Sequence, residues 1–311
     1  MERWSDTRCL VNFYKAFQLR VAADLEFPEL LAAEPGEPDV VFRREEIARD
    51  EPLAGWKNQL CADGSFTVED QAVNFRMVVR DNATVVYDAA AEWMEPDGRT
   101  HLLSHGFAAL MYLRGHVPLH ANVLRAPSRN YCIAIAGARG AGKSTTSLKL
   151  MGRGWRLVSD DLCVTRLDPA AATALPGFPR LKLWPSTLAA FGYEAAEYSR
   201  LWRGQEKRHF PLDRKYFDAA EAPLSDVFVL EASAKSESVT ARGVVGLEKV
   251  MLLRPHLMAA ASQGVDQDPG RLLSLVARLS QFVRLTVVQR PIGKDSTESL
   301  ADVIESRLAK P

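Results

Sequence analysis

The segment with the most specific chemistry is Gly137–Ser144, whose order Gly-Ala-Arg-Gly-Ala-Gly-Lys-Ser fits the phosphate-binding pattern G-x-x-x-x-G-K-[ST]. Glycines let successive backbone N–H groups turn inward around an anion, and a following helix points its positive end at it. The apolar run Tyr131–Ala136 precedes the segment and a predicted helix, Lys143–Arg153, follows it. We therefore predict a nucleotide site formed by Gly137, Arg139, Gly140, Ala141, Gly142, Lys143, Ser144 and Thr145. The alternative is a glycine-rich turn that binds nothing.

Two adjacent acids, Asp160 and Asp161, end the apolar segment Leu157–Ser159. An acid at the end of a strand beside a phosphate-binding loop is a common magnesium ligand. Neighbouring side chains on a strand project in different directions, so one carboxylate could face a metal ion and the other an incoming nucleophile. The alternative is a solvated turn or a helix cap.

A single histidine, His120, lies on the predicted strand Val117–Arg125, just before the strand that leads into the glycine-rich loop. A lone histidine on a strand is more often structural than catalytic. His120 could approach the loop only if Val117–Arg125 and Tyr131–Ala136 are antiparallel neighbours, for which Pro127–Asn130 would be the hairpin loop.

These features, in this order, resemble the catalytic domain of HPr kinase/phosphorylase, a bacterial serine kinase. That family has Leu-His-Gly, a strand, a glycine-rich loop ending in Gly-Lys-Ser, a helix ending in Arg-Gly, and an apolar strand closing in Asp-Asp. The corresponding residues here are Leu119-His120-Ala121, Gly137–Ser144, Arg153-Gly154 and Leu157–Asp161. The resemblance is specific over His116–Leu167, and the Asp-Asp strand is also similar to that of phosphoenolpyruvate carboxykinase.

The resemblance implies a kinase that uses ATP and Mg²⁺ and transfers the γ-phosphoryl group to a serine hydroxyl of a peptide or small protein. Some divergent relatives act on lasso-peptide precursors, and the layout of this chain resembles theirs. Lys143 would bind phosphates, Ser144 and Asp161 would hold Mg²⁺, and Asp160 would accept the proton of the hydroxyl. His120 would lie beside the transferred phosphoryl group.

The sequence departs from the family at three places. Ala121 replaces a glycine, Arg139 replaces a serine of the loop, and Phe178–Trp184 lacks the glutamate that the family links to the metal and to its phosphorylase reaction. Basic residues there and beyond, Arg180, Lys182 and the run Gln205–His209, could neutralise phosphate charge or form a solvated loop. The missing acid favours another hypothesis, a non-catalytic regulatory module that binds ATP. A kinase of a small metabolite, which would use the same loop and acids, is a further alternative.

The elements around these residues predict an α/β fold of two domains. Residues 1–115 predict a small α+β domain, to which we assign substrate recognition as a hypothesis, with strands at Cys9–Leu25, Val40–Arg43, Ser65–Val68, Val73–Val79 and Thr84–Tyr87 and a helix at His101–Arg114. Residues 116–311 predict a P-loop domain like that of HPr kinase and phosphoenolpyruvate carboxykinase. His101 and His105 have the i, i+4 spacing of a zinc pair, but no third ligand is evident, so a structural pair is favoured.

Composition limits the partners. Lys plus Arg is 39 and Asp plus Glu is 39, so the 311-residue chain has no net charge and lacks the positive field that nucleic-acid binding needs. Apolar runs of 18 residues and a signal-peptide core are absent from the sequence, which predicts a cytoplasmic protein without membrane contact. Cys9, Cys61, Cys132 and Cys163 are expected to be reduced thiols. The oligomeric state stays open, and the expected partner is a serine-containing peptide.

Overall fold

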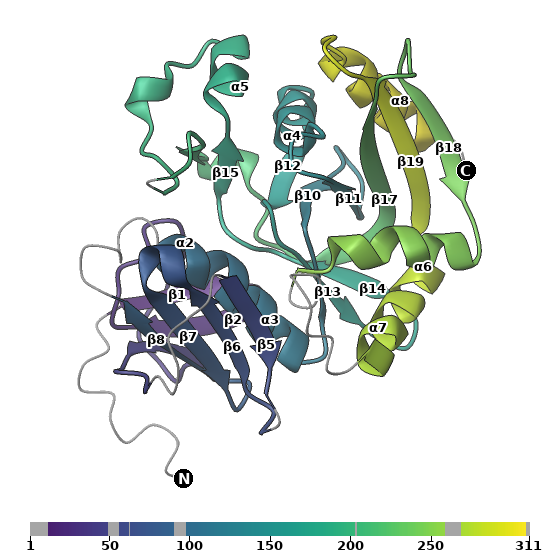
Figure 1. The fold of residues 1–311 in the computed structure, drawn as a ribbon. Coiled ribbons are helices and arrows are strands. Elements are labelled where there is room, and N and C mark those ends of the chain that lie inside the picture. The colour runs from purple at the N-terminus through teal and green to yellow at the C-terminus, as the bar shows by residue number, and fades with distance from the viewer. Residues whose placement is uncertain are drawn as a thin grey trace.

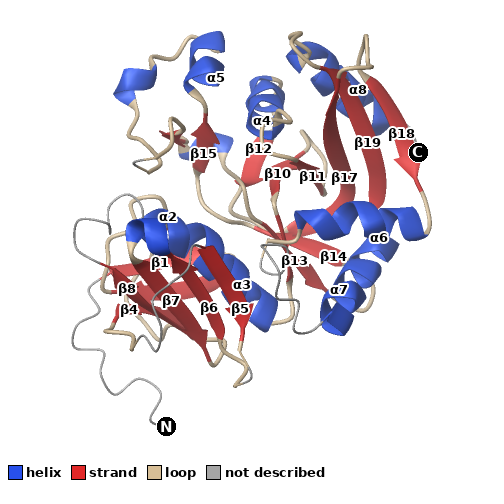
Figure 2. Ribbon diagram, in the orientation of Figure 1, coloured by secondary structure: helices blue, strands red, loops and turns tan. Residues whose placement is uncertain are grey.

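Three β-sheets and the helices packed on them make up a mixed α/β structure (Figures 1 and 2). The computed structural model describes residues 12–48, 56–61, 63–89, 98–202, 204–258 and 269–308. Among these residues, none of the helices combines the length and apolar character needed to cross a bilayer.

The N-terminal part is built on an eight-stranded mixed sheet with the order β3-β1-β2-β4-β8-β7-β6-β5. Its strands are β1 (Asn12–Ala16), β2 (Leu19–Ala23), β3 (Leu31–Ala32), β4 (Val40–Arg44), β5 (Trp56–Leu60), β6 (Phe66–Asp70), β7 (Phe75–Arg80) and β8 (Thr84–Ala89), with the 3₁₀ turn η2 (Gln71–Val73). A continuous helical segment packs on the sheet and consists of α2 (Arg99–His101), the π-helical turn η4 (Leu102–Gly106) and α3 (Phe107–Leu113).

The second part holds a nine-stranded sheet, a separate hairpin and five helices among the described residues. The sheet contains β9 (Val117–Leu119), β10 (Ala121–Arg125), β11 (Cys132–Gly137), β12 (Arg156–Ser159), β13 (Cys163–Leu167), β14 (Ala172–Leu175), β17 (Ala222–Ser233), β18 (Thr240–Val244) and β19 (Arg284–Pro291). The hairpin is β15 (Arg180–Leu183) with β16 (Arg208–Pro211). The helices are α4 (Lys143–Gly152), α5 (Pro185–Ala190), α6 (Leu247–Leu253), α7 (Pro269–Phe282) and α8 (Thr297–Leu308), with 3₁₀ turns η5 (Ala195–Glu197), η6 (Arg214–Tyr216) and η7 (Arg254–His256).

Strand β11 is the centre of this sheet and carries the glycine-rich loop at its end. It pairs antiparallel with β10 and parallel with β17, which in turn is parallel to β19. Alternate residues of β11 enter two different cores: Ile133 and Ile135 pack in the cluster that contains α4 and α8, whereas Ala134 and Ala136 pack in the larger cluster on the other face. A strand buried on both faces is apolar without alternation, which is why this run is so clear in the sequence.

Two predicted strands are each two strands in the structure. Residues 12–23 form the hairpin β1–β2, which turns at Phe17 and Gln18 with positive φ angles of 51° and 64°. The sequence has no Gly or Asn there to signal such a turn. The predicted strand Val117–Arg125 breaks at His120, because β9 pairs with β13 while β10 pairs with β11 and β12.

Two predicted helices also differ from the structure. The predicted helix His101–Arg114 contains a π-helical turn. The sequence also predicts a helix over Leu247–Ser262, of which residues 259–262 lie outside the described part of the chain. In the structure α6 ends at Leu253, and the 3₁₀ turn η7, which contains Pro255, follows it. Proline lacks the N–H that a longer helix would need.

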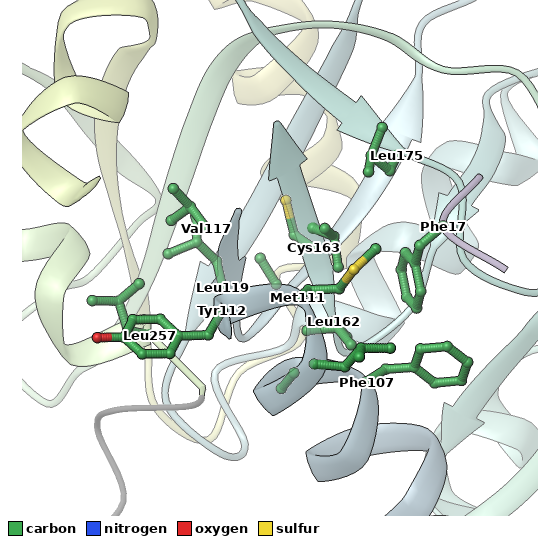
Figure 3. Packing of buried hydrophobic residues seen from close by; sticks show 14 of the residues in the cluster. Phe17, Phe107, Met111, Tyr112, Val117, Leu119, Leu162, Cys163, Leu175 and Leu257 are labelled. Carbon is green, nitrogen blue, oxygen red and sulfur yellow. The ribbon is translucent and has the colours of Figure 1, made fainter. Parts of the chain in front are cut away.

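One hydrophobic cluster runs from the N-terminal sheet into the nine-stranded sheet. Figure 3 shows Phe17 of the β1–β2 turn beside Phe107 of α3, with Leu119, Cys163 and Leu175 of the second sheet nearby. The Phe17 ring lies 5.3 Å from that of Phe107 and 6.0 Å from that of Phe178, both in edge-on arrangements. The eight-stranded and nine-stranded sheets lie on either side of residue 115 in the sequence, and buried side chains from both join in one of the two hydrophobic clusters.

The cysteines in the described residues are free thiols, of which Cys132 and Cys163 are buried and Cys61 is half-buried. Burial raises the pKa of Cys163 to about 11, which makes this thiol unreactive. Cys9 lies outside the described residues.

Candidate active site

The loop between β11 and α4 has the strand–loop–helix arrangement that the glycine-rich motif requires. Gly137, Gly140 and Gly142 adopt positive φ angles of 150°, 82° and 106°, which side chains rarely tolerate. A Cβ on Gly137 would stand 2.7 Å from the carbonyl oxygen of Leu230, so the strand could not pass there with any larger residue. Lys143 begins α4, and its Nζ donates to the carbonyl oxygen of Gly137 at 2.7 Å.

Arginine 290 of β19 braces the loop from behind, a contact that sequence reasoning missed. Its Nε donates to the carbonyl of Ala141 and its Nη2 to that of Gly140, both at 2.9 Å. These carbonyls point toward Arg290, so the loop conformation is tied to the neighbouring sheet. Arg290 lies about 150 positions after the loop in the sequence, which is why the motif gives no sign of it.

A cavity of about 600 Å³ opens on the loop. Of the residues predicted to bind nucleotide, Arg139, Gly140, Gly142, Lys143, Ser144 and Thr145 line it. The other two, Gly137 and Ala141, lie on the side of the loop away from the cavity, where Gly137 packs against Ala141 and Leu230. The cavity is strongly cationic: Lys182, Lys207, Arg290 and Lys294 join Arg139 and Lys143 on its walls, against the carboxylates Asp161 and Asp295. Burial, reinforced by Lys207, lowers the pKa of Lys143 despite the nearby Asp161.

The two adjacent aspartates have separate environments. Asp161 lines the cavity, whereas Asp160 is not among the described residues that line it and is only 2% exposed. The Oδ2 atom of Asp160 accepts a hydrogen bond from the backbone N–H of Lys182 at 2.8 Å, and its Oδ1 has no partner. Burial and the neighbouring Asp161 carboxylate raise the pKa of Asp160 to about 6. Asp160 therefore anchors β15, and Asp161 faces the space where a ligand would lie.

Asp161 has an unusual backbone conformation and three polar contacts. Its φ is +68°, and its N–H donates to Oδ1 of buried Asn122 at 3.1 Å. Oδ1 of Asp161 lies 2.9 Å from Nε2 of His120, and Oδ2 accepts from Nζ of Lys182 at 2.6 Å. Burial acts to raise the pKa of Asp161, but Lys182 and His120 together hold it well below its usual value.

His120 is brought to the site by the break between β9 and β10. The antiparallel pairing of β10 with β11, on which its approach to the loop depends, is present. Its backbone N–H donates to the carbonyl of His256 at 2.6 Å, and its half-exposed ring lines the cavity beside Asp161. The structure thus brings His120, Asp161 and Lys143 to one cavity.

The N-terminal part also reaches this cavity, through Ser104 and His105 of the π-helical turn η4. Ser104 accepts a hydrogen bond from Nζ of Lys182 at 2.8 Å. The ring of His105 lies 5.7 Å from that of His101 in a tilted arrangement, and burial lowers the pKa of His105 to about 3, so it stays neutral. The pair at His101 and His105 is therefore part of a stacked aromatic cluster that includes Trp202.

The basic residues of the segment that lacks the family's glutamate, and of the run that follows it, have different surroundings. Arg180 is buried between Glu29, at 3.6 Å, and the ring of His209, at 3.2 Å, and points away from the cavity. Lys207 and Arg139 both lie over the ring of Trp184, at 5.7 Å and 5.2 Å from its centroid, on the cavity wall. Lys207 and Arg139 are therefore placed to meet phosphate charge, while Arg180 joins β15 to the N-terminal part.

The oxygen atoms of the predicted magnesium ligands, Ser144 and Asp161, fit a divalent cation only in part. The Ser144 hydroxyl lies on the cavity wall at the start of α4, where it could join phosphate oxygens and waters around Mg²⁺. Asp161, the other predicted ligand, already has both oxygens against nitrogen donors. Within the described part of the chain, no three His, Cys, Asp or Glu side chains gather closely enough to hold a metal ion.

No protein-family model and no curated protein matches the chain. Among solved structures, the chain is similar to the HPr(Ser) kinase/phosphatase from Coxiella burnetii, with 14% sequence identity and a TM-score of 0.33. The match covers 61% of this chain and 93% of that one. A likeness this distant assigns no activity, so the function has to be inferred from the cavity itself.

Proposed function

We propose that the chain is an ATP- and Mg²⁺-dependent kinase that transfers the γ-phosphoryl group to a serine-type hydroxyl of a peptide or small protein. One observation carries the proposal: a glycine-rich loop with Lys143 at the start of a helix shares one cavity with the Asp161–His120 pair. Phosphoryl transfer needs phosphate-binding amides and cations beside a carboxylate that can receive a hydroxyl proton, and the cavity offers both.

The residues divide the reaction between them. The loop amides and Lys143 would hold the β- and γ-phosphates, with Arg139 and Lys207 as further cations. Mg²⁺, held by the Ser144 hydroxyl and the phosphates, would neutralise charge on the phosphate oxygens. The acceptor oxygen forms a bond to the γ-phosphorus while the bond from that phosphorus to the bridging oxygen breaks and ADP leaves. The hydroxyl proton passes to a carboxylate.

Asp161 is the better candidate for that carboxylate. A base must first be within reach of the proton it accepts, and Asp161 lines the cavity while Asp160 faces the backbone of β15. The role that the sequence assigned to Asp160 stays a prediction. We assign to Asp160 the role of positioning Lys182, and to Asp161 the role of accepting the proton. The acceptor hydroxyl would contact the Oδ1 atom of Asp161, which also contacts His120.

A second function, an ATP-binding regulatory module without turnover, is favoured by the pairing of both Asp161 oxygens with Lys182 and His120. One experiment separates the two functions. Wild type, Asp160→Asn and Asp161→Asn are incubated with γ-labelled ATP, Mg²⁺ and serine-containing peptides, with the exposed Asp213→Asn as a matched control. ATP affinity is measured alongside by calorimetry.

The kinase predicts label on a serine, unchanged in Asp213→Asn and reduced on the order of 10²–10⁴-fold in Asp161→Asn, while ATP still binds. A larger loss in Asp160→Asn than in Asp161→Asn would return the base to Asp160. ATP binding without transfer to any peptide would favour the regulatory module. Transfer to a small hydroxyl compound alone would favour the metabolite kinase.

A further inference from the structure

Lys182 is a buried lysine at the floor of the cavity. It is 5% exposed and stands in β15, and its Nζ donates to Oδ2 of Asp161 at 2.6 Å and to Oγ of Ser104 at 2.8 Å. Lysine is almost never buried without a partner, because its ammonium loses hydration. Its two partners come from different parts of the fold, so the position of the ammonium is defined from both sides.

The ammonium group of Lys182 occupies one oxygen of the Asp161 carboxylate, and a divalent cation held by Asp161 would need that carboxylate. Mg²⁺ binds oxygen ligands and is repelled by a fixed positive charge at the same carboxylate. The other oxygen of Asp161 faces His120 at 2.9 Å. The described residues hold no cluster of three metal-binding side chains, and the neighbouring acid, Asp160, accepts from the backbone of β15 and does not line the cavity.

We propose that Lys182 is a built-in cation of the active site, which neutralises Asp161 and faces the transferred phosphoryl group in place of a protein-held divalent ion. The divalent cation of the reaction would then enter only with the nucleotide, at Ser144. The catalytic part of this proposal rests on the proposed kinase function, whereas the exclusion of a metal ion from Asp161 does not.

Ser104 is the positioning residue for this cation. The hydroxyl is buried at the π-helical turn, which interrupts the helical segment just before the apolar helix α3. Such turns often occur at functional sites, because they redirect side chains that a regular helix would place elsewhere. The N-terminal part would in this way contribute to catalysis as well as to any recognition of substrate.

Metal binding tests the proposal without turnover. Binding of Mn²⁺ is followed by electron paramagnetic resonance in the absence of nucleotide, for wild type, Lys182→Gln, Lys182→Glu and the double variant Lys182→Glu/Asp161→Asn. Lys215→Met, at an exposed position, is the control for loss of a lysine. Wild type and Lys215→Met should bind no Mn²⁺, the two Lys182 variants should gain one site, and the double variant should lose it.

Wild-type protein that binds one Mn²⁺ ion in the absence of nucleotide would overturn the proposal. So would folded Lys182→Gln and Lys182→Glu proteins that both fail to gain a site. The wild-type measurement needs no variant, so misfolding of the substituted chains cannot leave the question open.

Transfer assays then test the catalytic part. With ATP and Mg²⁺, Lys182→Gln should lower kcat on the order of 10²–10³-fold, as loss of one cation at developing charge does. Ser104→Ala should lower kcat about tenfold with KM for ATP unchanged, and Ser104→Thr should restore it. A folded Lys182→Gln protein with wild-type kcat would refute the role. Wild type without any transfer would instead refute the kinase function and leave the Mn²⁺ result standing.

Discussion

Asn122 is the residue on which the geometry of the candidate base depends most directly. It is 1% exposed in β10, and its Oδ1 accepts from the N–H of Asp161 while its Nδ2 donates to Oγ of Ser147 at 3.0 Å. The Ser147 hydroxyl donates onward to the carbonyl of Lys143 at 2.9 Å. One side-chain amide thus joins the turn at Asp161 to the first turn of α4.

Replacing Asn122 by alanine removes both bonds. A buried polar group that loses its partner costs about 1–3 kcal/mol, and both the Asp161 N–H and the Ser147 hydroxyl would be affected. The left-handed backbone of Asp161 is strained by roughly 1–2 kcal/mol, and this strain favours movement of the turn once the Asn122 contact is lost. We expect Asn122→Ala to lower the free energy of unfolding by about 1–3 kcal/mol and to displace Asp161.

Ser147→Ala is the matched comparison, because it breaks the contact with Asn122 but leaves the Asn122–Asp161 bond in place. It should cost about 1–2 kcal/mol of stability with nearly normal kcat. Asn122→Ala should lower kcat about 100-fold, since small misplacements of a reacting group have effects of that size. Urea unfolding measures the stability of the two variants, and peptide phosphorylation measures their kcat. Equal kcat values for the two folded variants would refute the view that Asn122 sets the position of Asp161.

Three further predictions follow from other contacts. Gly137→Ala should lower stability by roughly 1–3 kcal/mol or more and weaken ATP binding, because a Cβ there meets the Leu230 carbonyl; unchanged thermal unfolding would contradict this. Folding raises the pKa of Asp160 from 3.8 to about 6, so its ionisation opposes folding across that interval, and the penalty is complete above about pH 6. Asp160→Asn should therefore stabilise the protein at pH 7.5 but not below pH 4, and urea unfolding with the same difference at both pH values would argue against it. The fragment 116–311 lacks Phe17, Ser104 and Phe107, so we expect neither near-ultraviolet circular dichroism nor cooperative unfolding; a folded, active fragment would show that the shared core is dispensable.

The elements that sequence predicts best are those whose pattern depends on neighbours in the chain. The run ending at Gly137, the helix from Lys143 and the strand Arg156–Ser159 are where the motif and the apolar pattern place them. The turn at Phe17 and Gln18 was not predicted, because its left-handed backbone is stabilised by burial of Phe17 against Phe178 and needs no local turn residue.

The sequence motifs predict only part of the cavity lining. The loop, His120 and Asp161 lie together in the cavity, whereas Lys182, Ser104 and Arg290 reach it through strand pairing and helix packing that no short pattern reports. The distinct surroundings of Asp160 and Asp161 are a further example. The two side chains are identical and adjacent in sequence but point in different directions. The positive φ of Asp161 turns its carboxylate toward the cavity, while the backbone of β15 holds the carboxylate of Asp160 inward.

The β1–β2 turn has a consequence for the order in which the protein is made. Phe17 leaves the ribosome some 160 residues before its partner Phe178. Until then the ring has only Phe107 and the rest of the N-terminal sheet to pack against, and one of its faces is exposed to the cell. Closing so long a loop is a slow step, and an exposed aromatic ring on a nascent chain is a natural contact for a chaperone. Folding of the part that carries the glycine-rich loop would then be timed by the arrival of residues 176–178, which complete the pocket for this ring.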